Sequence, residues 1–222
     1  RLAAAIKLPV PPVHLIQVPE TVYIVQRYDR IVSGDIVKCL HQVDGCQLLG
    51  LGQDWKYERQ GLVSLKRIVE ALRGLQLPAK DLLSFQRWVM FNYLIGNSDA
   101  HAKNISVLID ETGYALAPFY DLLCVQVYGD DRLALYIGDE DQYASIGAHS
   151  WEAFCEDCGF SVKSTMTLFR KMAQDVAKAW ATVTAQATVD FALSRPELGL
   201  IQSITMVIET NCSAALSMTT KR

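Results

Sequence analysis

The stretch Asn97-Ser98-Asp99-Ala100-His101-Ala102-Lys103-Asn104 decides the fold of this chain, because its polar side chains need a particular frame around them. Asp99 is followed five residues later by Asn104, and a second carboxylate, Asp121, comes 17 residues after Asn104. Between Asn104 and Asp121 lie two apolar runs separated by Asp110-Glu111-Thr112-Gly113, a polar loop ending in glycine that is typical of a β-hairpin. The spacing therefore predicts that a linear pattern folds into a cluster.

The two apolar runs, residues 105–109 and 114–118, are expected to be strands. If they pair antiparallel, Asn104 and Asp121 emerge at the same end of the hairpin, and Asp99 lies at that end in the loop that feeds the first strand. Grouped carboxylate and amide oxygens, together with phosphate oxygens, suit Mg²⁺, which takes few protein ligands. An Asp, an Asn five residues later and a second Asp beyond a hairpin is the layout with which kinases hold metal and a hydroxyl acceptor.

Each of these residues also has a purely structural interpretation. Asp99 could form a turn, Asn104 could cap a strand end, and Asp121 could be the N-cap of a following helix. His101 could be a satisfied structural histidine, and Lys103 a solvated charge. The joint pattern, rather than any single residue, favours a functional site.

The regions around the hairpin are expected to be mostly helical. Apolar side chains at helical spacing predict a long, largely buried helix over residues 81–95 that stops at Gly96, which suits a C-terminal cap. The expected fold class is mainly α with small β elements (α+β). The other expected elements are strands within 13–28 with a turn at 18–20, helices over 35–50 and 64–74, a helix over 151–158 capped by Ser150, a helix over 161–193, and a last helix running from a breaker at Arg195-Pro196 to about Leu216.

Composition limits the class of protein. The 222 residues, 50% of them hydrophobic, suffice for one sizeable core or two closely joined subdomains. No apolar run reaches the length that spans a bilayer, and no leader of the signal-peptide type is present, so a cytoplasmic location is expected. The net charge of -3 argues against an extended nucleic-acid footprint on this chain.

The cysteines predict reduced thiols rather than a metal site. Cys155-Glu156-Asp157-Cys158 is a lone C-x-x-C pair, whereas a structural zinc site usually needs a second pair or suitably spaced histidines. The six cysteines form no regular even framework, which suits a reducing compartment.

Three segments of the sequence resemble the HipA family of bacterial serine/threonine kinases, which are the toxin halves of toxin–antitoxin pairs. Residues 93–104 look like the catalytic loop of that family almost letter for letter. Residues 116–122, Leu-Ala-Pro-Phe-Tyr-Asp-Leu, look like its metal-binding motif. The third segment runs from 25–30 through 40–47 to 56–58 and is similar to the family's hinge and the region after it. The resemblance implies a protein-kinase-like C-lobe of HipA type with an all-helical C-terminal part.

The resemblance assigns a role to each polar residue of the site. Asp99 would accept or orient the proton of the attacking hydroxyl. Asn104 and Asp121 would hold Mg²⁺ against the phosphates of ATP. Lys103 would offset charge that develops on the transferred phosphoryl group, and His101 would stiffen the loop by hydrogen bonding.

A hinge and a domain division follow from the same resemblance. Val25, Gln26, Arg27 and Tyr28 would form the hinge whose backbone groups meet the adenine of ATP. Residues 1–30 would be hinge-proximal strands and a remnant of the N-lobe. The helical kinase C-lobe would occupy 31–222, with its catalytic hairpin at 97–122.

Some parts of the family pattern are missing from this chain. It contains no Gly-x-Gly-x-x-Gly and no Gly-x-x-x-x-Gly-Lys-Ser/Thr motif. The family's phosphate-covering loop, nucleotide-binding lysine and small N-terminal sheet lie upstream of the segment that matches Arg1. The chain is therefore expected to be a fragment, or the separately encoded core of a split kinase. After Lys56-Tyr57-Glu58 the family commonly has a Gly-Gly-Pro-Gly-like loop, which residues 59–64 lack, so this loop is given no role.

The expected function is transfer of the ATP γ-phosphoryl group to a serine or threonine hydroxyl of a protein, with an aminoacyl-tRNA synthetase as one implied substrate class. The expected partners are a DNA-binding antitoxin and a separate N-terminal kinase subdomain. Two rival functions stay open. One is a non-catalytic binding module that engages an antitoxin or a DNA-bound complex. The other is a metal-dependent hydrolase that uses Asp99, His101 and Asp121.

Overall fold

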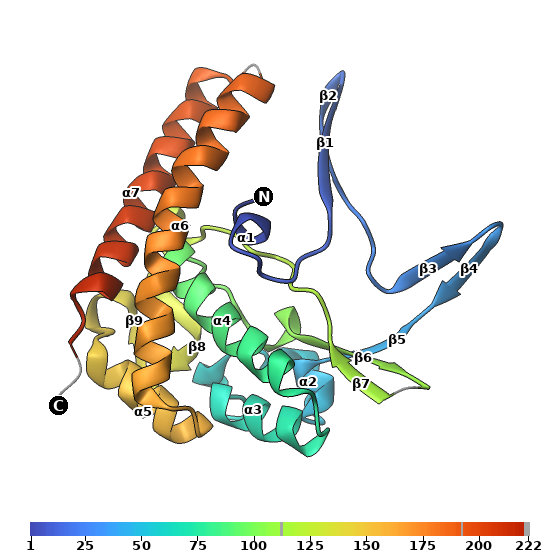
Figure 1. Ribbon diagram of the computed structural model, residues 1–222, viewed down its shortest axis with the longest axis vertical. Helices are drawn as coiled ribbons and strands as arrows, with labels where there is room; N and C mark the ends of the chain where they lie inside the picture. The colour runs from blue at the N-terminus through green and yellow to red at the C-terminus, as the bar shows by residue number, and fades with distance from the viewer. Residues whose placement is uncertain (112, 192, 220–222) are drawn as a thin grey trace.

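The computed structural model describes residues 1–111, 113–191 and 193–219, and of Gln17 only the backbone. A helical body carries β1–β7 on one side, with the hairpins β1–β2 and β3–β4 projecting from it, while β8 and β9 lie among the helices near α5 (Figure 1). The α+β fold class expected from the sequence is confirmed.

Two projecting hairpins follow the short helix α1 (Leu2–Ala5). Strand β1 (Val13–Val18) pairs antiparallel with β2 (Glu20–Val25), and β3 (Arg30–Ser33) pairs with β4 (Ile36–Cys39). The strands expected within 13–28, with their turn at Pro19, are therefore confirmed up to Val25. All of β2 and most of β1 are exposed, and both hairpins point away from the helices (Figure 1).

The helix expected over 35–50 is wrong for most of its length. Strand β4 is followed by β5 (His41–Asp44), and only the short helix α2 (Gly45–Leu48) is helical in this region. Residues Ile36 and Val37 are β-branched and pair with β3 across a tight turn, while β5 pairs with a strand far along the chain. Long-range strand pairing therefore overrides the local helical pattern until Asp44, whose side chain caps α2.

The hairpin expected after Asn104 forms with the predicted register. Strands β6 (Ser106–Asp110) and β7 (Gly113–Leu116) pair antiparallel, with Val107 opposite Leu116, and β5 adds to the free edge of β6 to make a three-stranded sheet. Thr112 of the expected hairpin loop lies outside the described residues.

Helices form the rest of the body. The last two run side by side as a long antiparallel pair that rises beyond the body (Figure 1). The major elements are α3 (Leu65–Gly74), α4 (Ala79–Ile95), β8 (Arg132–Ile137), β9 (Glu140–Gln142), α5 (Ala148–Cys158), α6 (Val162–Asp190) and α7 (Arg195–Ser217). The short 3-10 turns are η1 (Gln53–Trp55), η2 (Glu58–Gln60), η3 (Ala102–Asn104), η4 (Gln126–Tyr128) and η5 (Tyr143–Ser145).

The last helix begins and ends where it was expected, whereas the cap of α5 differs from the expected one. Helix α5 has its N-cap at Gly147, and the expected cap, Ser150, instead accepts a hydrogen bond from the Gly147 N–H at 3.2 Å from inside the first turn. Pro196 lies in the first turn of α7, just after the N-cap Ser194. Backbone N–H groups in the first turn of a helix have no partner within the helix, so a proline is tolerated there and marks the start of α7. The expected end of the preceding helix includes Ala192, which lies outside the described residues.

Helix α4 runs through the core and places the functional stretch. Its Tyr93 ring lies 5.8 Å from Trp151 and 5.7 Å from Phe169 between ring centroids, so α4, α5 and α6 share one aromatic cluster. The helix ends at Gly96, as expected, with a φ of 73° that favours glycine. A Cβ at Gly96 would lie 2.5 Å from Val207 of α7, so α7 packs directly over the end of α4.

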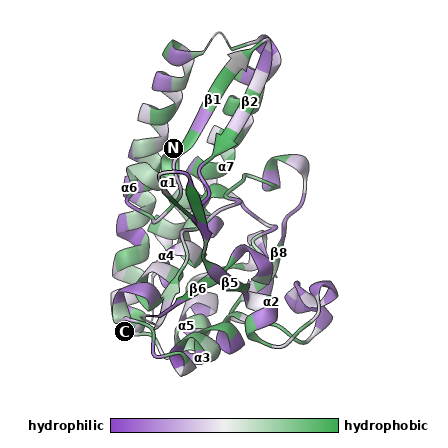
Figure 2. Ribbon diagram, turned by 90° about the vertical axis from the view of Figure 1, so that its right-hand side faces the viewer, coloured by the Kyte–Doolittle hydropathy of each residue, from purple (hydrophilic) through white to green (hydrophobic). Residues whose placement is uncertain are grey.

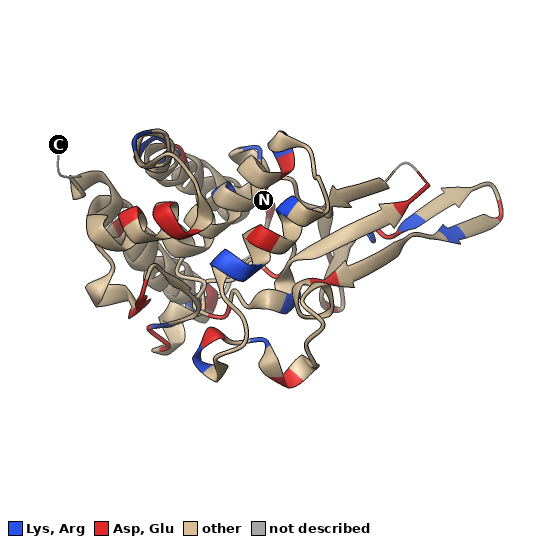
Figure 3. Ribbon diagram, turned by 90° about the horizontal axis from the view of Figure 1, so that it is seen from below, with Lys and Arg blue, Asp and Glu red and all other residues tan. Residues whose placement is uncertain are grey.

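None of the helices in the described ranges combines the length and apolarity that crossing a lipid bilayer requires. Acidic and basic residues are interspersed over the face seen in Figure 3. Hydropathy colouring shows apolar residues along β1 and β2 (Figure 2) although those strands are exposed. The six cysteines are free thiols, and Cys155 and Cys158 are buried.

Candidate active site

The stretch that begins with Asn97 is tied to its surroundings by a buried amide. The Asn97 side chain is 2% exposed, and its Nδ2 donates to Oδ1 of Asn92 at 2.7 Å and to the backbone carbonyl of Asp121 at 3.1 Å. Asn92 in turn donates to the Trp88 carbonyl within α4. The rigid end of α4 therefore holds the backbone of the second acidic residue.

Asn104 and Asp121 meet directly. Nδ2 of Asn104 donates to Oδ2 of Asp121 at 2.9 Å, and Oδ1 of Asn104 accepts from the His101 N–H at 2.9 Å. Asp121 has a φ of 57°, a left-handed conformation that is uncommon outside glycine. The chain after Asp121 stays irregular until η4, so its interpretation as an N-cap of a following helix is wrong.

Asp99 lies in the turn that leads to this pair, and its carbonyl accepts from the His101 N–H at 2.8 Å. Burial, and after it the nearby Lys56 ammonium, lower the pKa of His101, while the carboxylates of Asp99 and Asp121 act in the opposite direction. Both carboxylates therefore act to raise the pKa of the same buried imidazole. The lowered pKa leaves the imidazole neutral at neutral pH.

Two atoms of the loop are buried without a hydrogen-bond partner in the part of the chain that the structure describes. They are Nδ1 of His101 and Oγ of Ser98. The His101 ring also packs edge-on against Tyr57, with 5.6 Å between centroids. Buried polar atoms normally have partners, so these two are available to a ligand or an ordered water.

Two tyrosines connect the expected hinge, residues 25–28, with the loop that contains Lys103. The Tyr120 hydroxyl donates to the Lys103 carbonyl at 2.5 Å and lies 3.0 Å from Oγ of Ser106. The Tyr28 ring stacks on Tyr120 at 6.0 Å between centroids, and its hydroxyl donates to Oε1 of Gln42 at 2.8 Å. Burial raises the pKa of Tyr120 to about 12, which keeps its hydroxyl protonated as a donor.

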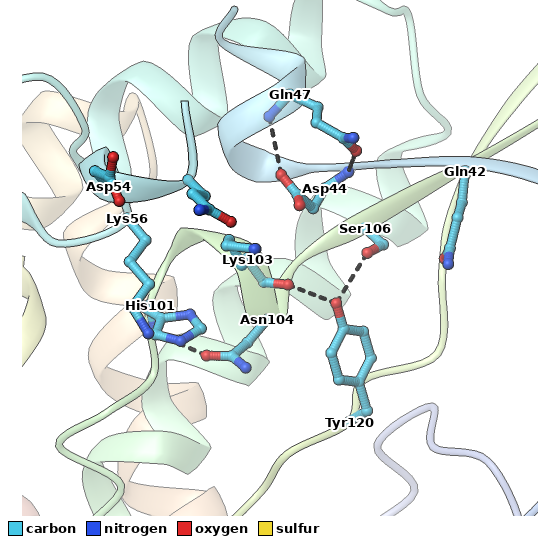
Figure 4. Close-up of a pocket in the computed structure, with 11 residues that line it drawn as sticks. Gln42, Asp44, Gln47, Asp54, Lys56, His101, Lys103, Asn104, Ser106 and Tyr120 are labelled. Carbon is cyan, nitrogen blue, oxygen red and sulfur yellow. Dashed lines mark hydrogen bonds between the residues drawn. The ribbon is translucent and has the colours of Figure 1, made fainter. Parts of the chain in front are cut away.

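A polar cleft of about 760 Å³ opens in front of these residues (Figure 4). It is bounded by strands β5 and β6, by α2 and η1, and by the loop itself. Its lining residues are Gln42, Asp44, Gln47, Gln53, Asp54, Lys56, His101, Lys103, Asn104, Ser106 and Tyr120. The cleft therefore offers both cations and hydrogen-bonding groups beside Asn104.

A second cavity, of about 890 Å³, reaches Asp121 from another direction. Its lining is mostly apolar and comes from the N-terminal segment, β1 and β2, the end of α4, residues 119–124 and the middle parts of α6 and α7; examples are Val25, Phe119, Trp180 and Ile208. Asp121 thus lies in this cavity's lining, while its partner Asn104 lines the polar cleft.

The expected hinge residues lead from the first projecting hairpin, at the end of β2, to the second, at the start of β3. The Gln26 N–H donates to the Pro12 carbonyl at 3.0 Å, so it is already occupied. Arg27 makes a two-pronged contact with Asp29, at 2.8 and 2.6 Å, and Tyr28 packs on the loop as described above. Val25 ends β2 and lines the apolar cavity.

Glu58 lies in a segment that contacts the loop, and it was assigned no role from the sequence. Its Oε2 accepts from the Tyr136 N–H of β8 at 2.7 Å. Burial first, with Asp157 and Asp139 adding to it, raises the pKa of Glu58 to about 7 against the effect of that hydrogen bond. The neighbouring Lys56 carbonyl accepts from Ala102 of the loop at 3.2 Å.

Other supporting residues lay within the quoted motifs but carried no assigned role there. Asn97 lies two residues before Asp99, and Tyr120 lies directly before Asp121. This closeness in sequence to predicted site residues was the signal that could have identified them. Gly45 is a third case, because a Cβ there would lie 2.5 Å from the Ala102 carbonyl oxygen. The start of α2 can approach the loop this closely only without a side chain.

The donor set fits a hard divalent cation that shares its shell with phosphate. Within the described ranges no three His, Cys, Asp or Glu side chains are grouped to hold a metal. One carboxylate, on Asp121, and one amide, on Asn104, are adjacent, and an amide oxygen can accept a second partner besides the His101 N–H. Mg²⁺ commonly binds through so few protein groups when substrate phosphates complete its shell.

The fold is that of a kinase. The structure of the Helicobacter pylori proinflammatory kinase CtkA matches 97% of this chain and 82% of that chain with a TM-score of 0.56, at 12% sequence identity. The structure of the Shewanella oneidensis MR-1 toxin–antitoxin complex of HipA, HipB and operator DNA gives a TM-score of 0.88 at 27% identity, covering 96% of this chain and 53% of that chain.

The sequence comparisons identify the family. The profile described as HipA-like C-terminal domain matches residues 1–180, so the chain belongs to the HipA family. It is 36% identical over 188 residues to the Sinorhizobium fredii protein named "Putative kinase Y4mE", covering 82% of this chain and 45% of that protein. It is 33% identical over 175 residues to the Shewanella oneidensis serine/threonine-protein kinase toxin HipA, covering 72% of this chain and 40% of that protein. The chain thus spans about half the length of these relatives or less.

Proposed function

We propose that this chain is the catalytic lobe of an ATP-dependent serine/threonine protein kinase that acts as the toxin of a toxin–antitoxin module. The observation that carries the proposal is the contact between Asn104 and Asp121 at the end of the catalytic hairpin, beside the loop that bears Asp99. A phosphoryl-transfer site needs such grouped oxygens, because most of its rate comes from positioning and charge stabilisation.

In the proposed reaction the acceptor hydroxyl oxygen forms a bond to the γ-phosphorus of ATP as the bond from that phosphorus to the β–γ bridging oxygen breaks. Asp99 accepts the hydroxyl proton, and ADP leaves. Asp99 lies in a turn and is half-buried, so its carboxylate is partly accessible to an incoming side chain.

Asn104 and Asp121 are the proposed ligands of Mg²⁺, which supplies positive charge to the phosphates when bound. Asn97 holds the Asp121 backbone, and Tyr120 holds the Lys103 carbonyl, so that the two sides of the site keep their spacing. Lys103, in the polar cleft, offsets charge on the transferred group. His101 stays neutral and gives the loop its shape through its backbone N–H.

The proposed adenine contacts come from the hinge, residues 25–28. Because the Gln26 N–H is bonded to Pro12, those contacts would use the other backbone groups of the hinge. Stacking of Tyr28 on Tyr120 links this hinge to the metal-binding motif, which supports a nucleotide lying across both.

A separate or upstream N-terminal subdomain is proposed as a structural partner. The hairpin of β1 and β2 exposes apolar side chains on both faces, since neighbouring residues Leu15 and Ile16 point to opposite sides and are 40% and 43% exposed. A lone two-stranded hairpin is marginal in water, so these strands favour completion by others. The HipA neighbour was solved with HipB and operator DNA, which supports a DNA-binding antitoxin as a further partner.

The acceptor is proposed to be a protein serine or threonine in the cytoplasm, with an aminoacyl-tRNA synthetase as one candidate. Its identity rests on the family resemblance alone. The rival interpretation as a binding module shares the fold and predicts no phosphoryl transfer. The hydrolase reading predicts phosphoester cleavage without ATP.

The test uses the full-length protein that contains this chain, together with any separately encoded subdomain. Binding of ATP is measured by calorimetry with and without Mg²⁺, and transfer of labelled γ-phosphoryl to serine or threonine is followed in a cell extract. Asp99→Asn and Asp121→Asn should abolish transfer, while Asp175→Asn on the exposed face of α6 makes the same chemical change far from the site and should not. Absence of both ATP binding and transfer in the unaltered assembly would overturn the proposal.

A further inference from the structure

Residues Lys56, Tyr57 and Glu58 form a short segment that is anchored to the catalytic loop and to β8 at three points. The Lys56 carbonyl accepts from the Ala102 N–H at 3.2 Å, and the Tyr57 ring packs on His101. The Glu58 carboxylate accepts from β8 at 2.7 Å. The segment therefore keeps a fixed position relative to the loop, although the two are more than 40 residues apart in sequence.

This anchoring directs the side chain of Lys56 into the polar cleft. In Figure 4 it extends alongside the His101 ring. Its Nζ lies over the Tyr57 ring, 4.7 Å from the centroid, a contact that orients an ammonium group without neutralising it.

Lys56 and Lys103 are the lysines that line this cleft, and no carboxylate lies within ion-pair distance of either among the described residues. Asp44 and Asp54 also line this cleft, but among the described residues neither forms an ion pair with Lys56 or Lys103, so both ammonium groups can contact an anionic ligand beside Asn104. Lysine is a common point-charge ligand of phosphate.

We infer that Lys56, together with Lys103, forms a phosphate-binding subsite that contacts the terminal phosphoryl group of ATP. The inference rests on the proposed kinase function and adds a residue from outside the catalytic loop to that site. Lys56 would contact the group that moves, while the rest of the nucleotide is held elsewhere. The subsite should therefore distinguish ATP from ADP.

The test measures the affinity of the full-length protein for ATP and for ADP, each with Mg²⁺, in Lys56→Met and Lys56→Arg variants. Loss of one charge-assisted contact should weaken ATP binding about tenfold or more in Lys56→Met, with ADP binding nearly unchanged. Lys56→Arg should restore most of the ATP affinity, because it keeps the charge. The matched control is Lys66→Met, because Lys66 is an exposed lysine of α3 that pairs with Asp157. This variant should change neither affinity.

The outcomes separate this inference from the proposed function. If the unaltered protein binds neither nucleotide, the proposed function fails and the inference fails with it. If both nucleotides bind but Lys56→Met leaves their affinity ratio unchanged, the kinase proposal stands and the inference is overturned. An equal loss for ATP and ADP would also overturn it, since that pattern indicates a general disturbance of the cleft.

Discussion

Asn104 and Asp121 are joined by a hydrogen bond of 2.9 Å between Nδ2 and Oδ2, although 17 residues and a complete hairpin separate them. The contact depends on the register of β6 and β7 below it, because a slip by one residue would move one partner to the other face. The hairpin register is thus the structural basis of the candidate metal site.

Replacing Asn104 by Asp should test this pairing directly. The change removes the donor and places a second carboxylate against Asp121, so the Mg²⁺-free protein should lose about 1–2 kcal/mol of stability. Mg²⁺ should restore more stability to the variant than to the unaltered protein, because the added carboxylate is a better ligand. Chemical unfolding with and without Mg²⁺ measures both effects, and equal responses of the two proteins would contradict the assignment.

Asn97 is expected to act through the backbone of Asp121. Asn97→Ala leaves the buried Oδ1 of Asn92 without its donor and releases the Asp121 carbonyl, which should cost about 1–3 kcal/mol of stability. Phosphoryl transfer should fall more than stability alone explains, because the left-handed Asp121 loses its support. The comparison is made at a temperature where the variant is fully folded. Unchanged transfer there would exclude the role.

Gly45→Ala should displace the catalytic loop. The new Cβ would lie 2.5 Å from the Ala102 carbonyl oxygen, so either α2 or the loop must shift. Lower thermal stability and reduced phosphoryl transfer are expected. Gly74→Ala at the end of α3 is the matched control, since a Cβ there meets no atom within 4 Å and should be neutral or slightly stabilising.

Glu58 should make stability depend on pH around neutrality. Its pKa is raised from 4.5 to about 7 in the folded protein, so the folded state binds this proton more tightly than the unfolded state. The contribution is fully present below pH 4.5 and is lost as pH rises through 7, amounting to on the order of 3 kcal/mol at most. Asp139, Asp157 and the Tyr136 N–H face the carboxylate.

Glu58→Gln keeps an oxygen that can accept from Tyr136 but cannot ionise. The variant should therefore lose much of the decline in stability between pH 4.5 and about 7 that the unaltered protein shows. Glu58→Leu fills similar space without an acceptor and should be less stable at every pH. Unfolding by urea across this range measures the difference, and parallel pH curves for the unaltered protein and Glu58→Gln would show that another group titrates.

Local patterns predicted the parts of the site that lie close together in sequence. Gly96 as the end of α4, the register of the hairpin and the meeting of Asn104 with Asp121 all follow from turn chemistry and strand alternation over a short span. The roles of Asp99, His101, Lys103 and the hinge residues came from the family resemblance and stay predictions.

Contacts between distant segments could not be predicted in this way. The stacking of Tyr28 on Tyr120 and the bond from Ala102 to Lys56 join segments whose relative placement is set only by the whole fold. The helix predicted over 35–50 was wrong at residues 41–44 for this reason, because β5 forms a strand by pairing with the distant β6 rather than through its own propensity. A single sequence carries little information on such pairings.

The open hairpin of β1 and β2 also affects how the chain behaves in isolation. Neither strand has a second neighbour within the described residues, so each presents an outer row of backbone groups. Such rows act as templates on which extended segments of other molecules can align, and apolar side chains on both faces strengthen that attachment. Produced alone, the chain should self-associate through these strands, and co-production with the proposed N-terminal subdomain should keep it monodisperse.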